Sequence, residues 1–225
     1  MNEPITRHPA FPYVAGMAAY LALIAVDRYL PFGPLAQFGL RFFLVLAVLI
    51  FASRGVITLR PSHALASILV GVGVFFLWVG PDYLWPTYRS HWLFSNSLVG
   101  VPRSSIDPAA KGNSLVILFR VLSSVVTVPV LEELFWRGWL MRWLVDKDFL
   151  KVPLGRCTPM SFWVVALLFA SEHGSYWEVG LLTGIIYNAW IIRTKNLADC
   201  MLAHAVTNAC LAAYVLKADQ WQYWL

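Results

Sequence analysis

The chain alternates between long apolar runs and short polar segments that carry charged residues, proline or glycine. An apolar run of roughly 20 residues is long enough to cross the hydrocarbon layer of a membrane as a helix. Charges, prolines and glycines between the runs mark where such helices end. The pattern predicts helices over residues 11–26, 39–52, 64–79, 114–145, 162–169, 178–192 and 197–216.

Two stretches leave the detailed organisation open. The run at 114–145 is longer than one span requires and contains Pro129, which removes a backbone donor and kinks a helix. One bent helix and two shorter helices both fit, so seven or eight helices are expected in total. Gly80 and Pro81 are expected to end the helix at 64–79. The segment 82–113 is expected to be a surface loop or an interfacial segment, because its Trp and Tyr residues suit the headgroup region.

The composition supports the same class of protein. The chain is 59% hydrophobic and 13% charged, with a mean hydropathy of +0.65, whereas soluble domains carry about 25% charged residues. We therefore predict an all-α, polytopic transmembrane helix bundle that forms a single membrane domain over residues 1–225, with the lipid bilayer as its surroundings. The apolar run at 11–26 lacks a clear cleavage site and is interpreted as a retained helix.

The charge and the cysteine content limit which binding partners and which stabilising cross-links are expected. The net charge of +5 is spread across the loops, which predicts contact with lipid headgroups rather than with nucleic acid. With seven spans and a cytoplasmic N-terminus, the Lys and Arg count favours, by a small margin, a cytoplasmic loop just after the helix that carries the glutamates. Cys157, Cys200 and Cys210 are odd in number and lack metal-site spacing, so neither a disulfide framework nor a zinc knuckle is expected.

Three charged residues stand inside the apolar run at 114–145: Glu132, Glu133 and Arg137. Left unpaired near the bilayer centre, they would cost about 9 kcal/mol in total, at roughly 3 kcal/mol each. Glu133 and Arg137 are four positions apart, so they lie on one helix face and can form an ion pair. Glu132 is rotated by about 100° from Glu133 around the helix axis. The ion pair therefore does not explain why a glutamate stands at position 132.

Later apolar runs supply further polar residues. His173 follows the run at 162–169, and His204 and Asn208 are four apart on one face of the last helix. Taken singly, each could be a packing residue, because polar side chains also form hydrogen bonds between membrane helices. If they converge with Glu132, they form a polar cavity within the membrane, which is a candidate functional site.

This set of residue types suits peptide hydrolysis. A glutamate and a histidine can hold and deprotonate a water molecule, and an asparagine amide and an imidazolium can stabilise the oxyanion that follows. Two histidines and a glutamate are also a common zinc ligand set, so residue types alone leave zinc open. The motifs HExxH, HxxEH and GxSxG are all missing, since Phe169 stands where HxxEH would need histidine. We therefore expect a glutamate-activated water and no cofactor.

Four motifs occur in order along these segments. They are EExxxR at 132–137, FxxxH at 169–173, an aromatic residue followed by two glycines (Trp177, Gly180, Gly184), and HxxxN at 204–208. In these residues the chain resembles the CAAX prenyl protease and bacteriocin-processing (ABI) family of intramembrane peptidases, over about residues 115–216. Trp177 stands where the family commonly has phenylalanine, which is a conservative change.

The resemblance implies a hydrolase, an intramembrane glutamate-dependent endopeptidase that cleaves a membrane-associated protein or peptide. In this reading, Glu132 activates the water with help from His173, and His204 and Asn208 bind the developing oxyanion. Glu133 and Arg137 brace their helix, in agreement with their spacing. The two glycines are interpreted as helix-packing positions, and Glu172 as a polar residue that flanks His173.

The resemblance also carries a finer implication about setting. The run at 132–144 and the tryptophan content are similar to CAAX-protease-related proteins that accompany bacterial exosortase/PEP-CTERM systems. This implies a multi-pass protein of the bacterial cytoplasmic membrane, with a substrate that either carries or lacks a lipid. The sequence specifies neither the substrate nor the oligomeric state.

Two other functions fit parts of the pattern. A non-catalytic immunity or assembly partner with the same fold would keep the helices and lose motif residues, yet all of the motif residues are present. A small transporter could use Glu132 and the histidines as a proton relay. Such transporters are commonly built from repeats with broken helices, and the sequence contains no inverted repeat. The endopeptidase is the preferred hypothesis.

Overall fold

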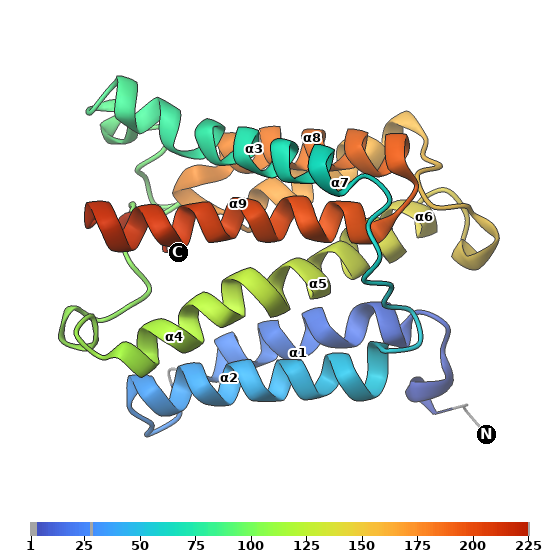
Figure 1. The fold of residues 1–225 in the computed structure, drawn as a ribbon, viewed down its shortest axis with the longest axis horizontal. Helices are drawn as coiled ribbons and strands as arrows, with labels where there is room; N and C mark the ends of the chain where they lie inside the picture. The colour runs from blue at the N-terminus through green and yellow to red at the C-terminus, as the bar shows by residue number, and fades with distance from the viewer. Residues whose placement is uncertain (1–3, 28, 225) are drawn as a thin grey trace.

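The chain folds into a bundle of helices in the computed structural model, which describes residues 4–27 and 29–224 (Figure 1). Within these residues no strand occurs, and the only β-type pairing is an isolated bridge between Asn96 and Gly100. Counting the continuous segment α4–α6 as one, seven helices are present: α1 (Phe11–Asp27), α2 (Pro34–Val48), α3 (Ala64–Leu84), α4–α6 (Ser114–Trp143), α7 (Pro159–Ser171), α8 (Trp177–Thr194) and α9 (Leu197–Ala218). The predicted all-α bundle of seven or eight helices is confirmed.

Four helical segments are long and apolar enough to cross a membrane. They are Pro34–Ser53, Ala64–Leu84, Ser114–Trp143 and Leu197–Ala218. The helices α1 and α7 are apolar but shorter. Large apolar side chains cover much of the outer surface, as expected for helices that face lipid.

The segment with the paired glutamates is one continuous helix, so the open choice between one bent helix and two short ones is settled. It consists of α4 (Ser114–Leu122), α5 (Val128–Glu133) and α6 (Met141–Trp143), joined by wider π-helical stretches at Ser123–Thr127 and Leu134–Leu140. Pro129 lies just after the first wide stretch, where the backbone pattern already departs from regular i to i−4 bonding. Wide turns of this kind are frequent at functional sites, and these two flank Glu132 and Glu133.

Several predicted helix ends were wrong by a few residues. The helix α3 passes through Pro81 and ends at Leu84, because a proline near the end of a helix disrupts little of the backbone hydrogen bonding, and Trp85 N–H still donates to the Pro81 carbonyl. The helix α2 begins at Pro34, a position that suits proline as a first helical residue. The helix α7 extends from Pro159, where Thr158 and Ser161 form a capping box.

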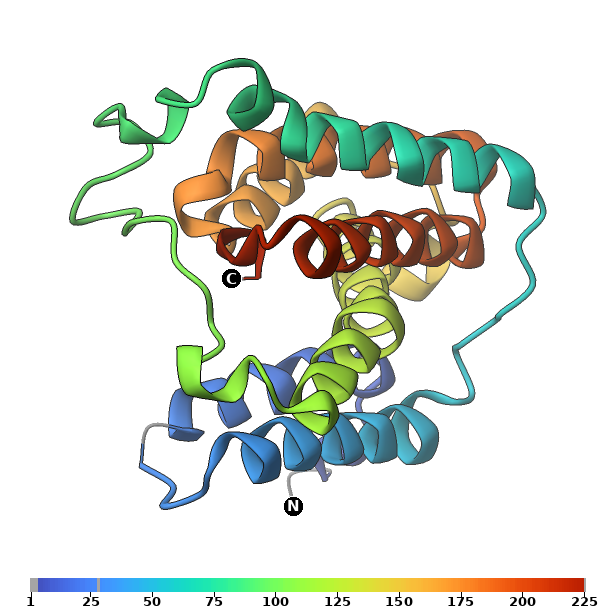
Figure 2. The same cartoon turned by 60° about the vertical axis from the view of Figure 1, so that its left-hand side comes forward.

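The helices surround the middle segment from two sides (Figures 1 and 2). The pair α1 and α2 lies on one side of α4–α6, and α3, α7, α8 and α9 lie on the other. The helix α3 packs along α9, and α7 packs along α8. Two apolar cores result, one centred on α3, α8 and α9 and one on α1, α5 and α7. The segment α4–α6, which carries the two glutamates, therefore lies between the two groups of helices.

Candidate active site

The residues selected from the sequence lie around one cavity. Glu132 from α5, His173 from the turn after α7, and His204 and Asn208 from α9 all line a cavity of about 420 Å³. Its α1 side is apolar, with Met17, Leu21 and Ile24. The four polar residues thus converge from three segments that are distant in sequence.

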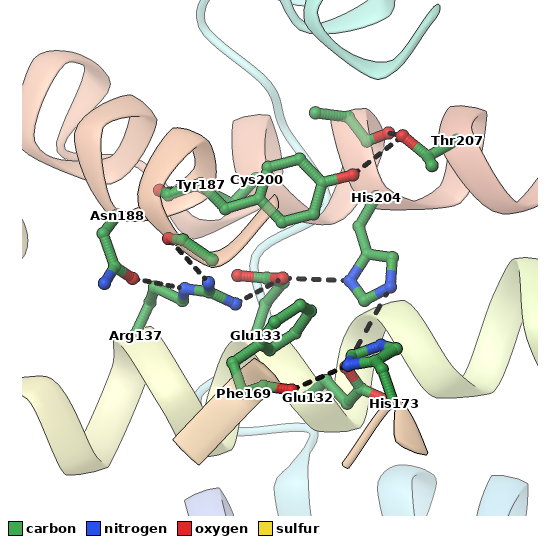
Figure 3. Close-up of polar contacts among 12 residues, drawn as sticks. Glu132, Glu133, Arg137, Phe169, His173, Tyr187, Asn188, Cys200, His204 and Thr207 are labelled. Atoms are coloured by element: carbon green, nitrogen blue, oxygen red, sulfur yellow. Dashed lines mark hydrogen bonds and ion pairs between the residues drawn. The ribbon is translucent and has the colours of Figure 1, made fainter. Parts of the chain in front are cut away.

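A buried row of polar side chains supports the cavity from behind (Figure 3). Arg137 and Glu133 are fully buried, and Arg137 Nη1 donates to Glu133 Oε1 over 3.1 Å. Arg137 also donates through Nε to Asn188 Oδ1 at 3.0 Å and through Nη2 to the Gly184 carbonyl at 3.3 Å. The ion pair expected from the four-residue spacing is present, and α8 holds its guanidinium in place.

His204 connects this row to the cavity. Its Nδ1 lies 3.0 Å from Glu133 Oε1, and its Nε2 lies 4.0 Å from Glu132 Oε2. Because an ionised carboxylate can only accept, Nδ1 carries a hydrogen and donates it to Glu133. The Nε2 atom therefore faces Glu132 and the cavity. When the ring is protonated, Nε2 is a second donor, aimed at any group that accepts a hydrogen bond there.

Glu132 has little support from protein groups. Its Oε2 is buried and forms no hydrogen bond with the described residues. Within the described chain, its one ion-pair contact is with His204, at the 4.0 Å already noted, and no His173 nitrogen comes within that distance of its carboxylate. A buried carboxylate oxygen without a protein donor is costly unless water or a ligand satisfies it. The carboxylate is thus placed to bind a molecule in the cavity.

His173 is held in a defined orientation. Its Nδ1 lies 2.7 Å from the Phe169 carbonyl, which can only accept, so Nδ1 carries the hydrogen and Nε2 keeps a lone pair in the neutral ring. Burial lowers the pKa of His173, which lies beyond the end of α7, to about 4. The rings of Trp78 and Phe169 contact the imidazole, with centroids 5.3 and 4.8 Å away. His173 is therefore a neutral hydrogen-bond acceptor at the cavity wall.

Asn208 also lines the cavity. Its Nδ2 donates to the Ser124 carbonyl at 2.7 Å. An amide nitrogen carries two hydrogens, so one remains for a ligand. His204 and Asn208, the two predicted oxyanion donors, both belong to α9, where they lie one turn apart on the same face.

The two motif glycines have different environments. A Cβ atom at Gly184 would lie 3.1 Å from Ala166 Cα, so this glycine lets α7 and α8 pack closely, as interpreted from the sequence. A Cβ atom at Gly180 would instead lie 3.0 Å from Nδ1 of His173 and 3.1 Å from its Cγ. Gly180 therefore makes room for the His173 ring.

We expect Gly180→Ala to lower kcat about tenfold with little change in thermal stability, because the added methyl group displaces the His173 ring and small misplacements in a catalytic site are costly. Gly73→Ala is the matched control, since a Cβ atom there would meet nothing within 4 Å. Gly184→Ala should mainly lower the melting temperature. Rates measured on the three purified variants test this, and a Gly180→Ala variant as active as Gly73→Ala would contradict it.

Several residues around the site were missed from the sequence. Asn188 fixes Arg137 and also donates to the Phe162 carbonyl at 2.9 Å. The Tyr187 ring packs beside His204, with centroids 5.4 Å apart, and its hydroxyl lies 2.8 Å from Thr207 Oγ1. Trp78 is in α3, outside all four motifs. The one available signal was Asn188, a polar residue within an apolar helix.

The arrangement of carboxylates and imidazoles at the site bears on whether it could bind a metal ion. Among the described residues, no group of three or more His, Cys, Asp or Glu side chains is arranged to hold a metal ion. Glu133 is occupied by Arg137 and His204, and the Nδ1 atom of each histidine faces a protein oxygen.

Comparison with known families identifies the segment that carries the site. Residues 114–210 match the sequence model of the Rce1-like family, described as type II CAAX prenyl endopeptidase Rce1-like. These residues are similar to the Rce1-like family. The match spans a little under half of the chain and contains all four motifs. The resemblance to CAAX proteases is confirmed, and the exosortase-associated subgroup stays a prediction.

The Rce1-like family is a family of proteases, which are hydrolases. Together with the four helices that are long and apolar enough to cross a membrane, the match indicates an integral membrane protein. Comparisons with curated proteins and with solved structures gave no significant match.

Proposed function

We propose that this Rce1-like protein is an intramembrane endopeptidase that uses Glu132 to activate a water molecule. The observation that carries the proposal is the position of Glu132: its buried Oε2 has no hydrogen-bond partner among the described residues and faces a cavity lined by His173, His204 and Asn208. Glu133, by contrast, binds Arg137 and His204 through its Oε1 atom and does not line the cavity, although its Oε2 is also buried and without a partner among the described residues. The non-catalytic alternative gives no role to a carboxylate that lines this cavity.

The chemistry follows from the placement of each group. A water held between Glu132 and the His173 Nε2 lone pair loses a proton to Glu132 as its oxygen attacks the peptide carbonyl. The new oxyanion accepts hydrogen bonds from protonated His204 Nε2 and from Asn208 Nδ2. When the C–N bond breaks, Glu132 returns the proton to the leaving amine. Every atom and proton is accounted for without a covalent enzyme intermediate.

The supporting residues keep this arrangement fixed. Glu133 holds the hydrogen on His204 Nδ1, which leaves Nε2 to face the substrate. Arg137 balances the charge of Glu133 and so keeps in place the carboxylate that orients His204. Catalytic groups that are preorganised in this way need no rearrangement during the reaction.

The substrate is proposed from the cavity walls and the resemblance. The apolar α1 wall suits the hydrophobic part of a membrane-associated protein or peptide, with or without an attached lipid. The resemblance supports a location in the bacterial cytoplasmic membrane and a link to exosortase systems. Incubating the protein in lipid vesicles with transmembrane peptides, and detecting the products by mass, tests the activity.

Asn208→Ala is expected to reduce kcat by about 10²–10³-fold with KM little changed, because it removes an oxyanion donor that acts in the transition state. Ser124→Ala is a suitable control, since the Asn208 amide bonds the backbone carbonyl of Ser124, which that variant retains. Steady-state rates on a peptide substrate would show the difference. A normal kcat for Asn208→Ala would remove Asn208 from the oxyanion site.

A further inference from the structure

A second cavity lies beside the site. It has a volume of about 600 Å³ and is bounded by the loop at 96–105 and by the turn that follows α7. It shares Glu172 and His173 with the site cavity. The two cavities therefore meet at the histidine that is proposed to hold the catalytic water.

The walls of this second cavity are chemically unlike the apolar α1 wall. Its lining residues are Asn96, Val99, Gly100, Val101, Arg103, Ser104, Ser105, Glu172, His173, Gly174 and Ser175. Arg103 is the one Lys or Arg among them, is exposed, and has no ion pair within the described chain. An unpaired guanidinium next to serine hydroxyls and an asparagine amide is a set of donors that suits a carboxylate.

The loop that carries Arg103 is anchored at several points. Ser105 N–H donates to the Trp224 carbonyl at 2.7 Å, and Ser175 Oγ donates to the Val99 carbonyl at 3.3 Å. Gly174 has a φ of +51°, and a Cβ atom there would lie 3.1 Å from the same Val99 oxygen. The cavity thus has a wall that is fixed against the turn carrying His173.

A second set of contacts fixes the preceding part of the loop. Arg89 donates to the Ser175 carbonyl at 2.7 Å and pairs with both Asp82 and Glu178, at 2.8 and 2.6 Å. Its guanidinium also stacks over Tyr176, 4.0 Å from the ring centroid. The guanidinium of Arg89 is therefore already bound by protein groups. Arg103 is the cation that can bind a ligand in the second cavity.

We propose that the second cavity is a substrate subsite that binds a carboxylate, with Arg103 as its specificity-determining residue. This inference rests on the proposed peptidase function. The apolar part of the substrate lies along α1, the scissile bond lies at the junction near Glu132 and His173, and a short polar tail enters the second cavity. The carboxylate is either an acidic side chain in that tail or the C-terminus of the substrate.

Glu172 fits this placement. Its partial burial at the end of α7 raises the pKa of its carboxyl to about 7. Near neutral pH, a substantial share of the group is therefore protonated, and it repels an incoming carboxylate less than an ordinary glutamate would.

Binding to the Glu132→Gln variant in lipid nanodiscs tests the subsite without requiring cleavage. The probes are peptides with an apolar stretch of about 20 Leu and Ala residues and a short tail. Four tails are compared: Asp with an amidated end, Asn with an amidated end, Asn with a free end, and Lys with an amidated end. The carboxylate-bearing peptide that gains affinity over the amidated Asn peptide identifies the source of the carboxylate.

We expect that peptide to bind about three- to tenfold more tightly, the range suited to a partly exposed charge pair. Adding Arg103→Gln should remove the gain, and Arg103→Glu should shift the preference to the Lys tail. Arg54→Gln is the matched control, because Arg54 is an exposed arginine in the loop at the opposite end of α3.

Equal affinity for all four tails, or an equal effect of Arg54→Gln and Arg103→Gln, would overturn the subsite. The experiment distinguishes a failure of the subsite proposal from a failure of the peptidase proposal. Tail-dependent binding in a protein whose wild-type form cleaves no peptide would contradict the peptidase and leave the subsite standing. Cleavage that is indifferent to the tail and to Arg103→Gln would contradict the subsite alone.

Discussion

Glu132→Gln is expected to remove peptide cleavage while the protein stays folded. The amide has nearly the shape of the carboxylate but cannot take a proton from water, and losing a general base typically costs about 10²–10⁴-fold in rate. No protein hydrogen bond to Oε2 is lost within the described chain, because none is present. The melting temperature should therefore stay near that of the wild type.

The measurement for this variant combines two readouts on one preparation. Thermal unfolding in detergent or nanodiscs reports the fold, and the rate of product formation from a transmembrane peptide reports the chemistry. An unfolded Glu132→Gln variant would show that Glu132 is a structural residue. A folded variant with wild-type rates would show that another group activates the water.

Glu133→Gln should have the opposite profile and lose stability first. Glu133 is fully buried and pairs with Arg137, which is also fully buried. Removing one partner of a buried ion pair costs about 3–5 kcal/mol, because the other charge is left without compensation. The variant should unfold at a clearly lower temperature, and its activity should fall as well, since Glu133 orients His204.

A double variant separates this explanation from a simple loss of packing. Glu133→Gln combined with Arg137→Gln removes both charges, so it should be less destabilised than the sum of the two single variants. Additive losses would mean that the two charges do not interact. If Glu132→Gln and Glu133→Gln proved equally folded and equally active, the division of roles between the two glutamates would be wrong.

The sequence was most informative at polar residues that lie inside apolar segments. Glu132, His173, His204 and Asn208 were selected because polar residues inside apolar segments are costly, and the structure brings all four to one cavity. The spacing of Glu133 and Arg137 predicted their ion pair correctly, because contacts within one helix depend only on local geometry.

The sequence was less informative about contacts between helices. Asn188, Tyr187 and Trp78 shape the site through packing across α3, α8 and α9, which no local pattern encodes. The role of Gly180 beside His173 was likewise hidden, since a glycine pattern in a helix commonly indicates helix packing. That His204 is the histidine closest to the Glu132 carboxylate was not foreseen, and the partnership of Glu132 with His173 stays a prediction.

Helix ends were predicted within a few residues, with proline as the main source of error. Pro81 was expected to end a helix that continues through it, and Pro129 lies inside a continuous helix. In both places the surrounding backbone tolerates the missing N–H, either close to a helix end or after a wide turn. A proline alone therefore did not determine where these helices stop.

The central claim is that Glu132 directs water onto a peptide bond, and its most direct test is cleavage of a transmembrane peptide in ¹⁸O-labelled water with hydroxylamine present. The account predicts that the wild-type protein releases a product whose new carboxyl group carries one ¹⁸O atom, that no hydroxamate forms, and that Glu132→Gln releases no product. A hydroxamate would reveal a covalent acyl-enzyme, and labelled product from Glu132→Gln at the wild-type rate would show that Glu132 is not the base. Either result would contradict the account.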